Sequence, residues 1–124
     1  MTEYIINGKN RLSGKLKLQG SKNASLPVLA ATLLTRSKCV IHNCPDLSDV
    51  RQSLNILTAL GCDCTYNDNT AVIDSTNAFG TEINEQLMCA MRSSIIFLGA
   101  ILSANGKATV SRPGGCELGP RPID

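Results

Sequence analysis

Apolar and polar positions alternate along this chain in a way that predicts short strands between helices. Residues 12–18 alternate with a period of two, and residues 3–6 form another short apolar stretch. These two stretches predict a pair of strands. Such a pair is only marginally stable by itself, so we expect it to need a further surface to pack on.

Two longer stretches predict helices that are apolar on nearly every side. In residues 21–35 either Ser21 or Ser25 suits the N-cap, and Pro27 suits the first turn. Residues 84–104 repeat large apolar side chains every 3.6 residues, and further apolar residues fill the remaining sides of their second half. We expect the first helix to be buried on most sides and the second half of the other to be enclosed all round.

The segments between these helices predict a sheet and a surface helix. Strands are expected at residues 38–42 and 107–111, and a hairpin at residues 62–74 turning at Asn67-Asp68-Asn69. A helix is expected that Pro45 and Asp46 open, that runs through Leu60 and that Gly61 ends. It has one apolar stripe, formed by Val50, Leu54 and Leu57.

An internal similarity appears when the chain is shifted by 69 residues. The matching pairs are Ser25/Ser94, Leu29/Leu98, Ala31/Ala100, Leu33/Leu102 and Lys38/Lys107. In both copies an apolar helix leads directly into a strand, which indicates a repeated helix-strand unit. Helices that are apolar all round, combined with strands, predict an α/β fold with its helices inside.

Composition narrows the class of protein. The chain has 124 residues, 43% of them hydrophobic, which predicts one folded domain and excludes a disordered polar chain. A net charge of +2 and 3% aromatic residues argue against a nucleic-acid partner. No secretory signal or membrane span is evident, so we expect a soluble cytoplasmic protein whose six cysteines are reduced.

Few side chains suggest chemistry. Cys116 follows two glycines, and Arg112 and Arg121 lie near it in sequence; cations lower a thiol pKa, so the alternatives are a reactive thiol and an inert loop cysteine. Lys22 and Asn23 begin an apolar helix, where they suit an anion or are simply solvated and capping.

Three further features have weaker claims. Arg92, at the edge of an apolar stripe, requires an anionic partner, either a ligand or a carboxylate. His42, the single histidine, is interpreted as structural because no triad arrangement is visible. A zinc site is disfavoured because paired ligand spacing is missing among Cys39, Cys44, Cys62 and Cys64.

Three motifs together resemble one family. They are Ser21–Pro27 (SKNASLP), Met91–Ser94 (MRSS) and Pro113–Asp124 (PGGCELGPRPID). They are similar to UDP-N-acetylglucosamine 1-carboxyvinyltransferases, which begin cytoplasmic peptidoglycan synthesis. The similarity runs along the whole chain in order. Because that family's chain is much longer, this sequence resembles only its first third.

The resemblance implies a fold and a reaction. The fold is an inside-out α/β barrel of the enolpyruvyl transferase type, built from repeated helix-strand units, with only the N-terminal portion present. Residues 1–20 would belong to the other domain, and residues 21–124 to an incomplete domain ending in the cysteine loop. The reaction transfers the enolpyruvyl group of phosphoenolpyruvate to the 3-hydroxyl of UDP-N-acetylglucosamine and releases phosphate, without metal or cofactor.

The resemblance also implies roles for single residues. Lys22 and Asn23 would bind phosphoenolpyruvate, with Lys22 also counted as catalytic, and Arg92 would bind the UDP-sugar. Cys116 would donate a proton to the methylene carbon, form an adduct with phosphoenolpyruvate or assist product release. The UDP part would be held by Arg121, Pro122, Ile123 and Asp124.

Other interpretations remain beside this one. One is a 5-enolpyruvylshikimate-3-phosphate synthase, which shares the fold and the enolpyruvyl donor but lacks the Pro-Gly-Gly-Cys loop. Two others, a non-catalytic anion-binding remnant and a zinc-binding adaptor, belong to a different functional class. The family's base for the sugar hydroxyl lies beyond the matched portion, so we expect these 124 residues to have no turnover. The sequence leaves the oligomeric state open.

Overall fold

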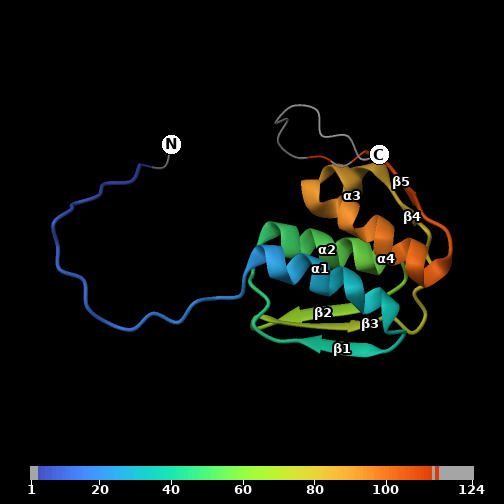
Figure 1. The fold of residues 1–124 in the computed structure, drawn as a ribbon, viewed down its shortest axis with the longest axis horizontal. Coiled ribbons are helices and arrows are strands. Elements are labelled where there is room, and N and C mark those ends of the chain that lie inside the picture. Colours follow the sequence, from blue (N-terminus) through green and yellow to red (C-terminus); the bar gives the residue numbers. More distant parts are fainter. Residues whose placement is uncertain (1–2, 113, 115–124) are drawn as a thin grey trace.

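The computed structural model describes residues 3–112 and Gly114. Helices α1, α2 and α4 lie over one face of a sheet, and residues 3–20 extend away from this body (Figure 1). The elements in chain order are α1 (Lys22–Ala31), η1 (Thr32–Leu34), β1 (Lys38–Ile41), α2 (Ser48–Ala59), β2 (Asp63–Asn67), β3 (Thr70–Asp74), β4 (Glu82–Ile83), α3 (Glu85–Cys89), η2 (Arg92–Ile95), α4 (Ile96–Asn105) and β5 (Thr109–Val110).

The main sheet is antiparallel with the strand order β1-β3-β2. In its register Ile73 of β3 lies opposite both Cys39 and Cys64. The hairpin turn uses Asp68 and Asn69, whose positive φ angles of 44° and 54° suit the right-handed twist of the strands it joins. The predicted hairpin and the strand at residues 38–42 are therefore confirmed. Strands β4 and β5 form a parallel pair. Of these two, the sequence predicted only β5, within residues 107–111.

Helix α2 packs against β2 of the sheet and against α1 and α3, and its predicted stripe is buried. Val50 and Leu57 are fully buried, and Leu54 is nearly so. The helix begins at Ser48 rather than at Pro45 or Asp46. Asp46 instead accepts hydrogen bonds from the Arg51 guanidinium, and this ion pair holds the pKa of Asp46 below its ordinary value.

The first helix differs from expectation at its start and on its outer side. Ser21 occupies the N-cap, but its side chain makes no capping bond; its carbonyl accepts from the backbone and hydroxyl of Ser25 instead. Pro27 lies inside α1, not in the first turn. The helix is not buried on most sides: Val28 and, in η1, Leu34 are 46% and 52% exposed, because no described element covers them.

The expected helix over residues 84–104 is divided into α3, η2 and α4. Asn84 caps α3 by accepting from the backbone N–H of Leu87, and the extended conformation of Met91 then interrupts the helix. In α4 only one side is covered, by burial of Phe97 and Ile101, whereas Leu102 is 52% exposed. The prediction that this half is enclosed all round is wrong for this chain.

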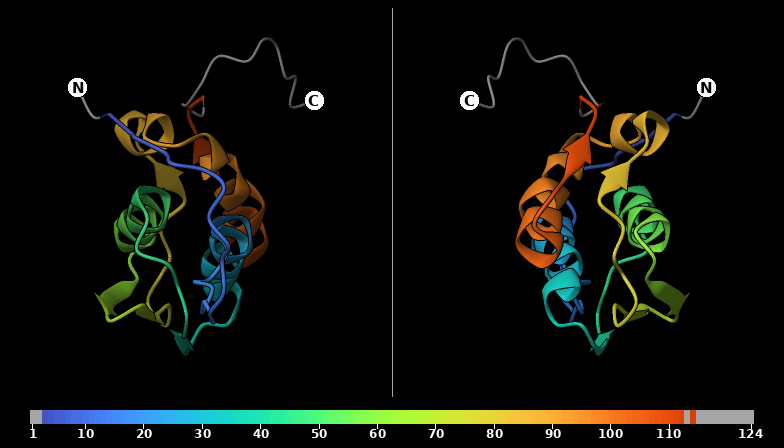
Figure 2. Two further views of the ribbon diagram at one scale, coloured as in Figure 1. Left: turned by 90° about the vertical axis from the view of Figure 1, so that its left-hand side faces the viewer. Right: turned by 90° about the vertical axis from the view of Figure 1, so that its right-hand side faces the viewer.

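The two helix-strand units predicted from the internal similarity are present. One runs from α1 through η1 to β1, and the other from η2 through α4 to β5. Helices α1 and α4 pack side by side, with α2 on the other side of the body (Figure 2). This mixed helix and strand arrangement confirms the α/β class.

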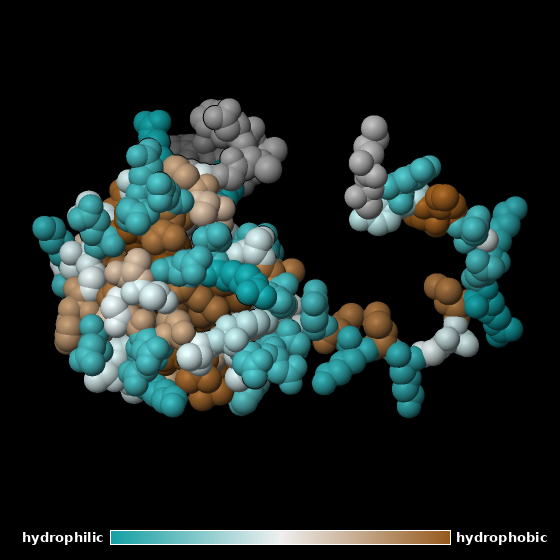
Figure 3. All heavy atoms as spheres, turned by 180° about the vertical axis from the view of Figure 1, so that it is seen from behind, coloured by the Kyte–Doolittle hydropathy of each residue, from teal (hydrophilic) through white to brown (hydrophobic). Residues whose placement is uncertain are grey.

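The two strands predicted in residues 3–6 and 12–18 are absent. Residues 3–20 form no helix or strand, and their large apolar side chains are 78–91% exposed along an extended arm (Figure 3). The reason is the one noted for an isolated strand pair: no described element offers it a surface. The arm meets the body at Gly20, where an added Cβ would overlap the carbonyl of Asn43.

None of the helices in the described part of the chain has the length and apolar character needed to cross a membrane.

Candidate functional site

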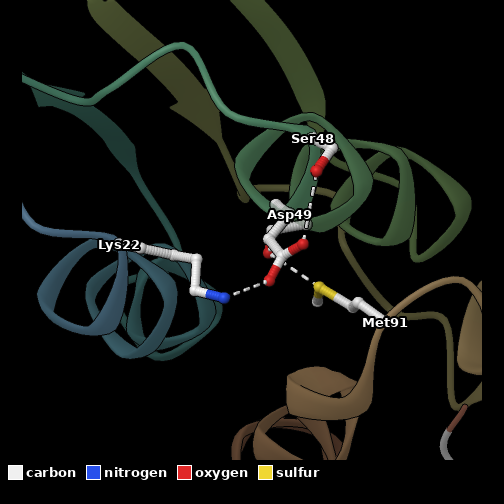
Figure 4. A network of polar contacts seen from close by, with 5 residues as sticks. Lys22, Ser48, Asp49 and Met91 are labelled. Carbon is white, nitrogen blue, oxygen red and sulfur yellow. Dashed lines mark hydrogen bonds and ion pairs between the residues drawn. The ribbon is translucent and has the colours of Figure 1, made fainter. Parts of the chain in front are cut away.

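Lys22 occupies the first position of α1 and reaches toward a neighbouring helix. Its ammonium Nζ lies 2.9 Å from Oδ2 of Asp49 (Figure 4). The Lys22 side chain is 48% exposed and the Asp49 side chain 25% exposed, so the pair borders solvent. An ammonium group has three N–H donors, and Asp49 occupies one of them. The other two can serve an incoming anion.

Asp49 belongs to the first turn of α2, where a helix favours negative charge. The Ser48 hydroxyl lies 3.4 Å from its Oδ1 (Figure 4). Because α1 and α2 pack together, the starts of both helices meet at this pair. The electrostatic potential at this place is therefore set by the two helix N-termini together with one cation, Lys22, and one carboxylate, Asp49.

A buried contact connects this pair to the turn before Arg92. The hydroxyl of Ser53 donates to the Asp49 carbonyl at 2.9 Å and lies 3.9 Å from Sδ of Met91. Ser53 is fully buried and Met91 is 3% exposed. Arg92 follows Met91 directly and is half-buried at the start of η2. Through this contact, α2 joins the Lys22 region to the segment that carries Arg92.

Asn23 is exposed beside Lys22 in the first turn of α1. Within the described residues its side-chain amide makes no hydrogen bond, so both its donor and its acceptor face solvent. The capping alternative for Asn23 is therefore not observed. The structure brings Lys22 and Asn23 onto one helix end, as the sequence predicts.

At Gly114 the chain returns to the end of α3. The Gly114 N–H donates to the Met88 carbonyl at 3.0 Å, and a Cβ at this position would overlap the carbonyl of Cys89. The Cys89 thiol lies 3.8 Å from the Arg112 carbonyl. The predicted site residues Cys116, Arg121, Pro122, Ile123 and Asp124 lie outside the described residues, so their meeting with Lys22 and Arg92 stays a prediction.

Of the described cysteines, Cys44 and Cys62 are buried, Cys39 and Cys64 are half-buried and Cys89 is exposed. Among the described residues no group of three or more His, Cys, Asp or Glu side chains is placed to hold a metal ion, which gives the zinc alternative no support. Burial raises the pKa of the Cys44 thiol. A hydrogen bond between Cys62 and Cys64 raises the pKa of Cys62 and lowers that of Cys64. His42 is exposed, with Nδ1 3.5 Å from the Thr70 hydroxyl.

Sequence reasoning missed two residues of this region. The apolar pattern assigns Asp49 no role, although an acidic residue in the first turn of a helix is a recognised preference. The sequence places Ser94 in the internal similarity and in the MRSS motif but indicates no role for it. Its role depends on a contact with Met88, six residues earlier across a helix break that the apolar pattern does not reveal.

Curated proteins are similar to this chain over its whole length. It is 45% identical over 124 residues to UDP-N-acetylglucosamine 1-carboxyvinyltransferase 2 of Caldanaerobacter subterraneus subsp. tengcongensis, covering 30% of that protein. It is 48% identical to UDP-N-acetylglucosamine 1-carboxyvinyltransferase of Methylacidiphilum infernorum, covering 29%, and 42% identical over 127 residues to a Staphylococcus aureus relative of the same name, covering 30%. The chain thus spans about 30% of the length of the curated relatives it matches.

A solved structure agrees with these sequence relatives. The chain is similar to the enolpyruvyl transferase NikO from Streptomyces tendae, with a TM-score of 0.69 and 30% identity, over 80% of this chain and 23% of that one. The family model described as EPSP synthase (3-phosphoshikimate 1-carboxyvinyltransferase) matches residues 6–124. These agreements confirm the enolpyruvyl transferase type of fold. Since the family model matches nearly every residue, the chain belongs to the EPSP synthase (3-phosphoshikimate 1-carboxyvinyltransferase) family.

Proposed function

We propose that these residues form part of an enzyme that transfers the enolpyruvyl group of phosphoenolpyruvate to the 3-hydroxyl of UDP-N-acetylglucosamine. The observation that supports this most is the physical link between Lys22 and the Met91-Arg92 turn through Asp49 and Ser53. The names of relatives at 42–48% identity support the same reaction. We also propose that this reaction is the first step of peptidoglycan synthesis and that it takes place in the cytoplasm.

The charges at the site suit two polyanionic substrates. In the proposed reaction Lys22 and Asn23 bind phosphoenolpyruvate, and Arg92 binds the UDP-sugar. A base outside these 124 residues takes the proton of the sugar hydroxyl as its oxygen bonds to C2 of phosphoenolpyruvate, and the methylene carbon takes a proton from Cys116 to become a methyl group. A base then removes a proton from this methyl group, the bond between C2 and the phosphate oxygen breaks, and phosphate leaves as the double bond forms again. The preorganised positive charges of Lys22 and Arg92 stabilise the negative charge that develops on the departing phosphate.

The arm is proposed to complete a sheet outside these 124 residues. Its alternating apolar side chains are exposed here, and the curated relatives are about three times as long as the matched segment. We propose that residues 1–20 belong to a second domain and residues 21–124 to the domain that carries the site.

A binding titration of the 124-residue protein tests the proposal. Phosphoenolpyruvate is expected to shift the amide signals of Lys22 and Asn23, and UDP-N-acetylglucosamine those of residues 91–95. Lys22→Met should weaken phosphoenolpyruvate binding at least about tenfold, since a charge-assisted contact contributes about 1.5–3 kcal/mol. The control Lys38→Met removes an exposed cation from β1 and should leave the affinity unchanged.

Two outcomes would count against the proposal. Equal losses in Lys22→Met and Lys38→Met would indicate attraction by net charge alone. Shifts produced by shikimate 3-phosphate but not by UDP-N-acetylglucosamine would favour a 5-enolpyruvylshikimate-3-phosphate synthase, the alternative that the relatives do not favour.

Cys116 provides a separate chemical test. We expect an electrophilic epoxide phosphonate to alkylate Cys116 faster than any of the other five cysteines, because the proposed site attracts its phosphonate. Peptide mapping that finds equal labelling at Cys116 and at the exposed Cys89 would contradict this role.

A further inference from the structure

The Met88 carbonyl is a meeting point of three segments of the chain. It lies in the last turn of α3, where helix carbonyls have no partner within the helix. The Ser94 hydroxyl of η2 donates to it at 2.9 Å, and the Gly114 N–H donates to it at 3.0 Å. One oxygen therefore joins α3, the turn that carries Arg92, and the chain two residues before Cys116.

Ser94 is placed for this contact by burial. Its side chain is fully buried, as is Met88, so water does not compete for the hydroxyl. A buried hydroxyl needs a partner, and this contact supplies it across the helix break at Met91. Ser94 lies two positions after Arg92 in η2, so the bond restrains the orientation of Arg92 relative to α3.

Gly114 is held at the same place by shape. A side chain at this position would overlap the Cys89 carbonyl, so only glycine allows the backbone to approach α3 this closely. The neighbouring contact of the Cys89 thiol with the Arg112 carbonyl keeps the preceding residues beside the same helix end.

From this geometry we infer that Ser94 is a positioning residue. Its hydroxyl, acting through the Met88 carbonyl, keeps the turn of Arg92 and the chain at Gly114 in one fixed arrangement. The inference rests on the proposed function, in which Arg92 and Cys116 serve one reaction. Its geometric content does not depend on substrate, so it is testable even if that function proves wrong.

Amide hydrogen exchange of the substrate-free protein tests this role. In Ser94→Ala the Gly114 amide is expected to exchange about five times faster, the effect of losing a hydrogen bond of about 1 kcal/mol from the arrangement that holds it. Ser94→Thr retains the hydroxyl and should leave Gly114 exchange within about twofold of wild type. Ser94→Thr changes the packing around position 94 by one methyl group but keeps the hydroxyl, whereas Ser94→Ala removes the hydroxyl. Comparing the two variants therefore separates the effect of packing from that of the hydrogen bond.

The matched control is Ser75→Ala. Ser75 is equally buried and donates to the Thr32 carbonyl at 2.7 Å, but it makes no hydrogen bond to Met88 or Gly114. Its loss should leave Gly114 exchange unchanged. If Ser94→Ala accelerates exchange equally at Gly114 and at the core amide of Ile73, the role is general stability and the inference is overturned.

A second variant approaches the same carbonyl from the other side. Gly114→Ala forces the backbone away from Cys89, so we expect shifted amide NMR signals for residues 92–95, which include Ser94. The amide signal of Ile73 should be unaffected. This variant changes a half-buried position and avoids removing a core hydroxyl. Unshifted signals in η2, or a wild-type Gly114 amide that exchanges at the unprotected rate, would overturn the inference.

Discussion

Arg36 and Asn105 bind each other across 69 residues, the same interval that separates the two sequence repeats. One follows η1 and the other ends α4, so equivalent ends of the two helix-strand units meet. The Arg36 guanidinium also donates to the carbonyls of Ala78 and Ala104, each at 2.6 Å, and lies over the Phe79 ring. Asn105 in turn donates to the Gly80 carbonyl. The repeats are thus joined by one polar cluster.

We predict that Arg36→Ala lowers the free energy of unfolding by about 2 kcal/mol, because it removes charge-assisted hydrogen bonds from a half-buried group. Arg36→Lys should recover less than half of this loss, because an ammonium cannot reproduce the planar fork of donors. Urea unfolding followed by circular dichroism measures both. The control Lys38→Ala removes an exposed cation of β1 and should change stability by less than about 0.5 kcal/mol.

A double-mutant cycle between Arg36 and Asn105 tests their direct coupling. Both residues contact the Ala78 carbonyl as well as each other, so we expect an interaction energy of about 1 kcal/mol. Additive losses would show that the two side chains stabilise the fold independently.

Asp49 is predicted to moderate the charge of Lys22. At 2.9 Å it occupies one ammonium donor and repels an approaching anion. Asp49→Asn should therefore raise the affinity of the chain for phosphoenolpyruvate about twofold to fivefold at low salt, with a smaller gain at high salt, because exposed charges are screened. An amide titration at two salt concentrations measures this. The control is Asp46→Asn, which removes a carboxylate that pairs with Arg51 and not with Lys22. Weaker binding of phosphoenolpyruvate by Asp49→Asn would contradict the prediction.

The two cysteines of the hairpin should differ in reactivity. The hydrogen bond from Cys62 lowers the pKa of Cys64 and raises its own, so Cys64 reacts with iodoacetamide before Cys62 at mildly alkaline pH. In Cys62→Ala the pKa of Cys64 should return toward its ordinary value and its labelling should slow. Cys44→Ala is the control, and mass spectrometry of labelled peptides gives the rates. Because folding raises the pKa of Cys62, its contribution to stability is complete below the unfolded pKa and is lost as pH rises through the folded value.

Asp74 gives a prediction in acid. Its carboxylate accepts from the hydroxyl and the backbone N–H of Thr76, and these bonds lower its pKa. A lowered pKa contributes stability that is present above the unfolded value of about 3.9 and is lost as pH falls through the folded value. Thr76→Val should raise the Asp74 pKa part of the way back, since the backbone bond remains. A carboxyl-carbon NMR titration checks this, and Thr65→Val on β2 should leave the pKa unchanged.

Local patterns predicted the elements that depend on neighbours in sequence. The hairpin follows from turn residues that accept positive φ, and the buried side of α2 follows from the 3.6-residue stripe of Val50, Leu54 and Leu57. The arm and the outer sides of α1 and α4 were predicted wrongly, because apolar character indicates what a side chain prefers to contact and not whether that partner lies in the same chain.

The candidate site was only partly accessible to the same reasoning. Lys22 and Asn23 are adjacent in sequence, and a helix start beside them is a local feature. Asp49 and Ser94 enter through contacts made by packing: one joins two helices 27 residues apart, and the other crosses the break at Met91. Hydrophobic periodicity over residues 84–104 conceals that break, because the apolar spacing continues through it.

The final prediction concerns turnover. These 124 residues are expected to release no phosphate from phosphoenolpyruvate and UDP-N-acetylglucosamine, because they span about 30% of the relatives' length and the base implied for the sugar hydroxyl lies beyond the matched portion. A phosphate assay with both substrates, compared with each alone, measures this. Lys22→Met purified in parallel is the control, since equal release from both preparations identifies a contaminating host enzyme. Release that requires both substrates and disappears in Lys22→Met would show that the cations of α1 and η2 suffice for catalysis without a base.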